Sequence, residues 1–191
     1  MGRWQGARFV QHAERAWPRV MPVYIALGSN LGDSAAYVKS AFANLQKLSD
    51  KPIQKSSLWR STPVDCPPGS ADFINAAVAI DPSPEETSES LLVKLQGLES
   101  QFGRQPKVEL NEPRPLDLDI IAFGEETRET IQLTLPHPRW HQRRFVLEPL
   151  SEIAPGAILP AQTQPVIQLL SELDTTEVLV RLLASHVTNK S

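Results

Sequence analysis

Two aspartates, spaced two residues apart in a largely apolar segment, are the side chains of this sequence best suited to chemistry. The segment reads Pro113-Arg114-Pro115-Leu116-Asp117-Leu118-Asp119-Ile120. Because side chains alternate between the two faces of a β-strand, Asp117 and Asp119 would share one face and the aliphatic side chains the other. Aspartate is a poor strand former, and Mg²⁺ takes one or two protein carboxylates together with water and phosphate. The spacing therefore indicates a metal-assisted phosphoryl-type transfer, with the solvated acidic face of a half-exposed strand as the alternative.

Arginines are concentrated in two places of a chain whose formal net charge is −3. Arg114 stands directly before the aspartate strand, and residues 136–145 contain three further arginines and two histidines. Guanidinium groups bind phosphate through paired hydrogen bonds, so these residues, together with Arg104, would neutralise a triphosphate. A solvated basic loop is the alternative. Neither histidine has neighbours at the spacing of zinc ligands, so we expect no zinc site.

An aromatic ring and an amide are expected on one face of another strand. Phe73 and Asn75 would share that face, while Ile74, Val78 and Ile80 pack on the opposite one. The ring could stack on a flat heterocycle, and the amide could pair with the polar edge of the same ligand. The alternative is a core phenylalanine beside an asparagine that bonds to backbone.

Composition limits the class of protein. The chain has 191 residues, 41% of them hydrophobic, which suits one compact domain. The single cysteine, Cys66, excludes an internal disulfide framework and is typical of a reducing compartment. No apolar run is long enough to span a membrane. Residues 1–20 are rich in arginine and poor in acids, so we expect a disordered leader or a mis-assigned start there, and a single domain over residues 21–191.

Hydrophobic periodicity predicts the elements that would position these side chains. The expected order is a strand at 23–27, a helix at 34–48, strands at 55–60 and 73–80, a helix at 84–102, and the aspartate strand. Ser83 would cap the second helix, and Gly103 would terminate it. This β-α-β-β-α-β order is that of an α/β (α+β) ferredoxin-like split βαββαβ sandwich.

The signals weaken beyond Gly124, where we expect an added C-terminal hairpin or helix extension. Residues 131–135 could form a strand, and residues 144–150 either a strand or a short helix. Residues 165–185 would hold one helix and another short element.

Five sequence blocks together resemble the 6-hydroxymethyl-7,8-dihydropterin pyrophosphokinase family. The blocks are Leu27-Gly28-Ser29-Asn30-Leu31-Gly32, Phe73-Ile74-Asn75-Ala76, Glu99 with Gly103-Arg104, Pro113-Arg114 with Leu116-Asp117-Leu118-Asp119, and Pro136-His137-Pro138-Arg139. The resemblance runs from about Val23 to Pro155. It implies a ferredoxin-like fold, ATP as co-substrate, two Mg²⁺ ions, and diphosphate transfer from ATP to 6-hydroxymethyl-7,8-dihydropterin with release of AMP, a step of folate biosynthesis.

The same resemblance implies roles for individual side chains. The implied metal ligands are Asp117 and Asp119, and the implied catalytic residues are Arg104, Arg114, Asp117, Asp119 and Arg143. The implied pterin-binding residues are Gly28, Ser61, Thr62, Val64, Phe73, Asn75 and Phe145. The implied nucleotide-binding residues are Gln96, Glu99, Arg114, Ile120, Thr134 and His137.

Other functions remain open at this point. A metal-dependent phosphohydrolase or nuclease could use the same aspartate pair, but it would need no pterin. A ferredoxin-like nucleic-acid-binding module is a third possibility, against which the acidic balance counts. We expect a cytoplasmic monomer that acts on small molecules and binds neither nucleic acid nor membrane.

Overall fold

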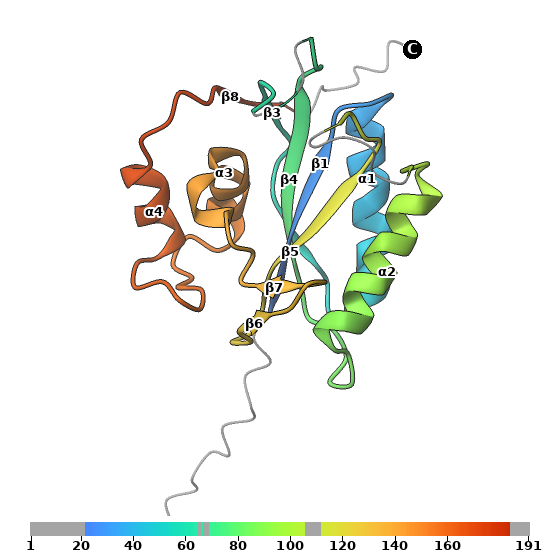
Figure 1. The fold of residues 1–191 in the computed structure, drawn as a ribbon, viewed down its shortest axis with the longest axis vertical. Coiled ribbons are helices and arrows are strands. Elements are labelled where there is room, and N and C mark those ends of the chain that lie inside the picture. The colour runs from blue at the N-terminus through green and yellow to red at the C-terminus, as the bar shows by residue number, and fades with distance from the viewer. Residues whose placement is uncertain (1–21, 65, 67–68, 106–111, 184–191) are drawn as a thin grey trace, which may run out of the picture.

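The computed structural model describes residues 22–64, 66, 69–105 and 112–183, so the predictions for residues 1–20 lie outside the described residues. An antiparallel sheet occupies the centre of the molecule (Figure 1). Its strands are β1 (Val23–Ser29), β2 (Gln54–Lys55), β3 (Trp59–Ser61), β4 (Phe73–Ile80), β5 (Asp117–Phe123) and β8 (Leu179–Arg181). The helices are α1 (Ser34–Leu45), α2 (Ser88–Gln101), α3 (Arg144–Ile153) and α4 (Val166–Glu172).

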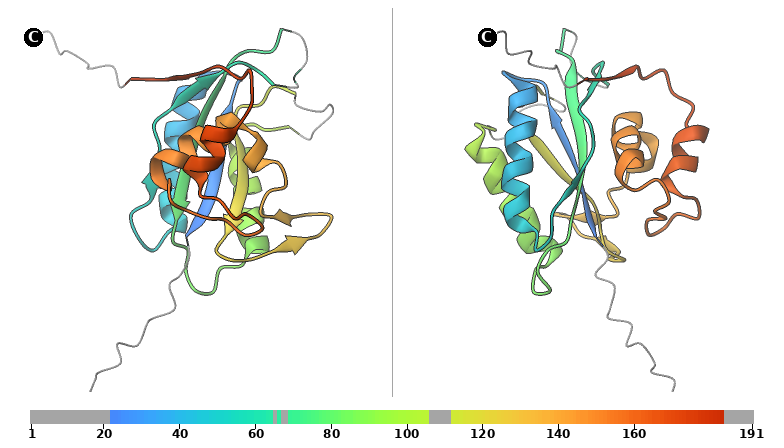
Figure 2. Two further views of the ribbon diagram at one scale, coloured as in Figure 1. Left: turned by 90° about the vertical axis from the view of Figure 1, so that its left-hand side faces the viewer. Right: turned by 180° about the vertical axis from the view of Figure 1, so that it is seen from behind.

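The order of the strands identifies the architecture. The sheet runs β5-β1-β4-β3-β8, with β2 also pairing with β4. Among the four strands of the expected βαββαβ unit, this is the spatial order fourth, first, third, second, with antiparallel neighbours. The predicted ferredoxin-like fold is therefore confirmed. Helices α1 and α2 cover one face of the sheet, and α3 and α4 lie on the other (Figure 2).

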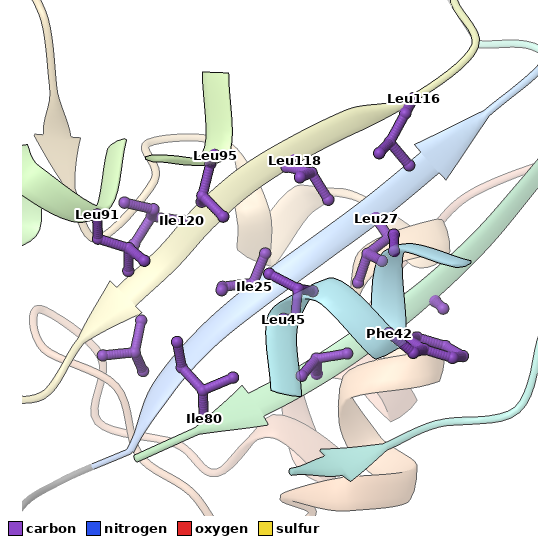
Figure 3. Close-up of a cluster of buried hydrophobic side chains, with 14 of the residues drawn as sticks. Ile25, Leu27, Phe42, Leu45, Ile80, Leu91, Leu95, Leu116, Leu118 and Ile120 are labelled. Atoms are coloured by element: carbon purple, nitrogen blue, oxygen red, sulfur yellow. The ribbon is translucent and has the colours of Figure 1, made fainter. Parts of the chain in front are cut away.

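The two faces of the sheet have separate hydrophobic cores. On the α1 and α2 side, Leu116, Leu118 and Ile120 pack among residues such as Leu45 and Leu95, as Figure 3 shows. The predicted alternation of the aspartate strand is thus confirmed. On the other side, a smaller core joins the sheet to α3 and α4. Its buried members are Ala77, Ile121, Ala122, Trp140, Val146, Leu147, Leu150, Ala154, Leu159 and Val166.

The second helix begins four residues later than the sequence predicts. Residues 84 and 85 form a turn, and the helix starts at Ser88 with Thr87 as its N-cap. The Thr87 hydroxyl accepts from the Ser90 amide at 3.2 Å, and the Ser90 hydroxyl accepts from the Thr87 amide at 3.1 Å. This reciprocal capping box satisfies two amides that have no intrahelical partner when the helix begins at Ser88. The predicted end is confirmed, because Gly103 follows the helix with a φ of +90°.

The C-terminal half also refines the predictions. The expected strand at 131–135 is reduced to β7 (Thr134–Leu135), which pairs with β6 (Arg128–Glu129). Residues 144–153 form helix α3 rather than a strand. Residues 165–185 contain the expected helix, α4, and a short strand, β8, which joins the edge of the main sheet beside β3. None of the described helices is long and apolar enough to cross a membrane.

Removing a core side chain from α2 tests this arrangement. Leu95 is fully buried, whereas Val93, two residues away on the same helix, is 66% exposed. We expect Leu95→Ala to lower the free energy of unfolding by about 2–5 kcal/mol through lost burial and the cavity left behind. Val93→Ala should change it by less than about 0.5 kcal/mol. Urea unfolding of both variants measures the difference, and equal losses would contradict the assigned faces of α2.

Candidate active site

The central strand β1 has two small residues, Gly28 and Ala26, on the face where its neighbours β4 and β5 carry polar side chains. Gly28 of β1 is opposite Asn75 of β4 and opposite Asp117 of β5. Ala26, in the next position on the same face, is opposite Asp119. Since glycine and alanine fill little space, the middle strand forms a low floor between carboxylates on one flank and an amide on the other.

The surroundings of Gly28 show which residues a larger side chain at this position would touch. A Cβ atom there would lie 3.7 Å from Oδ1 of Asn75. It would also lie 3.9 Å from Cβ of Asp117 and 3.9 Å from a ring carbon of Phe73. A side chain at residue 28 would therefore sit among three of the residues selected from the sequence.

A cavity of about 230 Å³ lies above this floor and gathers most of the predicted residues. It is lined by every predicted pterin-binding residue and every predicted catalytic residue: Gly28, Ser61, Thr62, Val64, Phe73, Asn75, Arg104, Arg114, Asp117, Asp119, Arg143 and Phe145. Lining residues that the sequence did not single out are Ala26, Leu27, Cys66, Arg139 and Val146. The basic segment 136–145 pointed to Arg139, but nothing local distinguished it from its neighbours.

A second cavity, also about 230 Å³, lies next to the first and shares Asp119 and His137 with it. Ile120 and Thr134, both predicted as nucleotide contacts, line this second cavity. Gln96, predicted for the same role, is exposed on α2 and lines neither cavity. The structure therefore brings together all the predicted site residues except Gln96 and Glu99.

Glu99 lies beneath the site rather than in it. It is buried, accepts a hydrogen bond from the Leu118 amide at 2.7 Å, and pairs with Arg104. Burial raises the pKa of Glu99 to about 7, as do the charges of Asp117 and Asp119, although the Leu118 amide and Arg104 act in the opposite direction. Glu99 thus ties α2 to the backbone of β5 and orients Arg104.

Two arginines hold Asp117. Arg104 Nη1 lies 2.7 Å from Asp117 Oδ1, and Arg114 Nη1 lies 3.4 Å from Asp117 Oδ2. The backbone of Arg114 is fixed in turn by Asn30, whose side-chain Oδ1 accepts from the Arg114 backbone amide at 2.8 Å and whose backbone amide donates to the Arg114 carbonyl at 3.1 Å. This double contact joins the loop after β1 to the segment before β5.

The carboxylate of Asp119 is electrostatically unfavourable without a cation. Burial and the neighbouring Asp117 raise the pKa of Asp119, and Arg143, Arg114 and Arg104 partly offset that rise. A divalent cation would stabilise both carboxylates. Among the described residues there is no group of three or more acidic, histidine or cysteine ligands, so the site suits an ion that takes its remaining ligands from phosphate and water. That description fits Mg²⁺ and does not fit a structural zinc site.

The opposite flank of the cavity combines two rings with a fixed amide. Asn75 Nδ2 donates to Ser61 Oγ at 2.8 Å, and both side chains are buried. This bond fixes the orientation of the amide and directs its remaining polar atoms. Phe73 enters from β4 and Phe145 from the start of α3, and the guanidinium carbon of Arg143 lies 5.4 Å from the centre of the Phe145 ring.

His137 is held neutral at the junction of the two cavities. Its amide donates to the carbonyl of Ile121 at 2.9 Å, where the β1–β5 register shifts. The Arg139 amide donates to His137 Nδ1 at 3.2 Å, so a neutral ring carries its proton on Nε2. Burial lowers the pKa of His137 to about 4, with the charges of Arg143 and Arg139 adding to the effect.

Comparison with known proteins identifies a family for this chain. Residues 24–155 match the model of the family described as 7,8-dihydro-6-hydroxymethylpterin-pyrophosphokinase. A relative named 2-amino-4-hydroxy-6-hydroxymethyldihydropteridine pyrophosphokinase from Synechocystis is 36% identical over 156 residues, covering 81% of this chain and 77% of the relative. The protein of the same name from Bacillus subtilis is 43% identical over 131 residues, or 68% of this chain and 76% of the relative.

Solved structures agree in fold. Plasmodium falciparum HPPK-DHPS, crystallised as the wild type with pteroate, has a TM-score of 0.61 at 13% sequence identity. The match covers 78% of this chain and 42% of that one, so this chain spans about two fifths of the solved protein. At that identity the likeness concerns the fold alone.

The neutral state of His137 predicts a pH dependence of stability. The unfolded histidine gains a proton near its ordinary pKa of about 6.5, whereas the folded one stays neutral until about 4. The contribution of the neutral His137 to the free energy of unfolding is therefore fully present above pH 6.5. It is lost as the pH falls toward 4, by on the order of 1–3 kcal/mol. Urea unfolding of wild type and His137→Asn at pH 7.5 and 5.0 measures this difference. If both proteins lose the same stability between these pH values, His137 is not the group responsible.

Proposed function

The chain belongs to the 7,8-dihydro-6-hydroxymethylpterin-pyrophosphokinase family, and we propose that the paired cavities beside β5 form its active site. The protein is an ATP-dependent diphosphotransferase of folate biosynthesis, which converts 6-hydroxymethyl-7,8-dihydropterin to its diphosphate. One observation carries the assignment of the site: Asp119, half-buried beside a second carboxylate and facing arginines, lies between the two cavities. Such a point suits the reacting phosphates, with one substrate on each side.

In this proposal the first cavity binds the pterin. Phe73 and Phe145 would stack on the two faces of the ring system, because flat heterocycles and aromatic rings attract in offset stacked arrangements. The buried amide of Asn75, held by Ser61, would read the polar edge of the pterin. Gly28, Thr62 and Val64 line the same cavity and would complete the binding surface.

The second cavity would bind the nucleotide. Ile120 and Thr134 line it, and His137 stands where it meets the first cavity. Glu99 would act through Arg104 rather than by touching the nucleotide. A nucleotide contact by Gln96 remains a prediction from the family resemblance alone.

Asp117 and Asp119 would hold the magnesium ions, which we propose to be two. Magnesium bound there would neutralise phosphate oxygens and polarise the phosphoryl group that is transferred. Asp117 already lies between two guanidinium groups, so positive and negative charges are packed closely in this part of the site.

The chemistry then requires positioning more than covalent participation by the protein. The hydroxymethyl oxygen attacks the β-phosphorus of ATP, the bond from that phosphorus to the α-phosphate oxygen breaks, AMP leaves, and the hydroxyl proton is lost. Arg104, Arg114 and Arg143 line the cavity and would stabilise charge on the transferred diphosphate and the departing phosphate. Of the residues that line the first cavity, Asp117 and Asp119 are the carboxylates available to take the proton.

The competing functions find no support in the comparisons. The relatives carry the pyrophosphokinase name and not that of a hydrolase or nuclease. Action as a cytoplasmic monomer without nucleic acid stays a prediction.

Product analysis tests the proposed function directly. The protein is incubated with Mg²⁺, ATP and 6-hydroxymethyl-7,8-dihydropterin, and the nucleotides are separated by chromatography. We expect AMP to form only when pterin is present. ADP as product, or nucleotide breakdown without pterin, would contradict diphosphate transfer and favour a hydrolase.

Replacing an aspartate tests the metal site. We expect Asp117→Asn to lower kcat by about 10²–10³-fold, since it removes a charge worth several kcal/mol in the transition state. Lys47→Ala, which changes an exposed residue bonded only to Asn44 in its own helical segment, should leave turnover near wild type. Steady-state kinetics over a range of Mg²⁺ concentrations provides the comparison, and near-equal rates for the two variants would refute the metal assignment.

A further inference from the structure

Helix α3 begins at the cavity without a cap of its own. Its N-cap residue is Arg143, whose side chain makes no capping hydrogen bond, and its first turn contains no acidic residue. The first amides of a helix have no intrahelical partner and need one from elsewhere. Glu177 supplies it, because Oε2 of Glu177 accepts a hydrogen bond from the Phe145 amide at 3.1 Å.

The capping residue comes from outside the part of the chain that defines the family. The family match ends at residue 155, whereas Glu177 lies 22 positions further on, between α4 and β8. In Figure 1 the chain leaves α4, passes α3 and reaches the sheet at β8. We call residues 173–183 the C-terminal strap.

The C-terminal strap is fixed to the other wall of the same cavity. Leu179 of β8 is paired with Ser61 of β3, and Ser61 holds the Asn75 amide. Beyond β8, the Leu182 amide donates to the Leu58 carbonyl at 2.8 Å. The strap therefore links the start of α3, where Phe145 lies, to β3, the strand that supports the polar side of the cavity.

Charge favours the same contact. The carboxylate of Glu177 lies at the positive end of the α3 dipole and near Arg143 and Arg144, which stabilise its charged form. Burial raises the pKa of Glu177, whereas the hydrogen bonds from the Phe145 and Arg144 amides lower it. An acid placed in this way both caps the helix and holds its first turn against the cavity.

We infer that Glu177 is a positioning residue for the pterin side of the active site, acting through Phe145. The inference rests on the proposed function in one respect, namely that the Phe145 ring contacts the pterin. When Glu177 is absent, the first turn of α3 loses its cap and the ring loses its fixed place over the cavity. The loss affects pterin binding more than nucleotide binding, since Phe145 lines the first cavity and not the second.

Substitution at residue 177, with a control on the same extension, tests the inference. Glu177→Ala removes the acceptor, and Glu177→Gln keeps an acceptor oxygen without the charge. The control is Glu172→Ala on α4, which removes contacts to Gln164 and Gln168 and leaves α3 untouched. We expect Glu177→Ala to raise the KM for pterin by about 2- to 30-fold, the range spanned by loss of a helix cap. The KM for ATP should change less than the KM for pterin, and Glu177→Gln should recover most of the pterin affinity.

Hydrogen exchange provides a readout that does not depend on activity. We expect the amides of Arg144 and Phe145 to exchange faster in Glu177→Ala than in wild type or Glu172→Ala. Faster exchange with an unchanged KM for pterin would overturn the positioning role, as would equal KM values for Glu177→Ala and Glu172→Ala. Equal impairment by Glu177→Ala and Glu177→Gln would exclude the capping hydrogen bond as the cause. Wild type that makes no pterin-dependent AMP would instead refute the proposed function, while the exchange data would still report on the cap.

Discussion

The structure of the site depends on keeping two carboxylates close together in a recess that is partly shielded from water. Asp117 and Asp119 share one face of β5, and the charge of Asp117 raises the cost of charging Asp119. The cost is offset by arginines that reach the recess from separate parts of the chain. Arg104 follows α2, Arg114 precedes β5, and Arg143 stands at the start of α3. The positions of α2 and α3 against the sheet therefore serve the electrostatics of a single strand.

Strand β1 contributes space rather than chemistry. Its residues Gly28 and Ala26 lie opposite Asp117 and Asp119, and a larger side chain at either position would occupy the floor of the cavity. The register shift between β1 and β5 adds a second effect, because it coincides with the Ile121 carbonyl that accepts the amide of His137. An irregularity in the sheet thus fixes the loop that separates the two cavities.

The pterin side of the site has a different kind of support. One of its two aromatic rings, Phe145, belongs to α3, a helix that starts with a residue unable to cap it. Its polar wall belongs to Asn75 of β4 and Ser61 of β3. The C-terminal strap joins these two walls through Glu177 and β8. Residues that carry no reacting group can therefore influence how well a substrate is held.

The sequence by itself determined everything that rests on local periodicity. Alternation assigned Leu118 and Asp119 to opposite faces, and the order of strands and helices identified the ferredoxin-like fold before any contact was known. The family motifs selected residues that, with the exceptions of Gln96 and Glu99, line the two cavities. Patterns with periods of two or four residues are properties of a short segment and can be read directly from it.

Tertiary contacts decided the rest. Helix α2 is capped by Thr87 and not by the predicted Ser83, and the Ser88 hydroxyl beside that cap donates to Glu126 at 2.9 Å, 38 residues further on. The sequence of residues 144–150 had no hydrophobic period that favoured a helix over a strand. In the structure this segment is helical, with Glu177 as its cap and with Ala77 and Ile121 in the core against which it packs. Such choices depend on residues far apart in the chain, because the partner that satisfies an amide or buries a side chain is known only after the elements have packed.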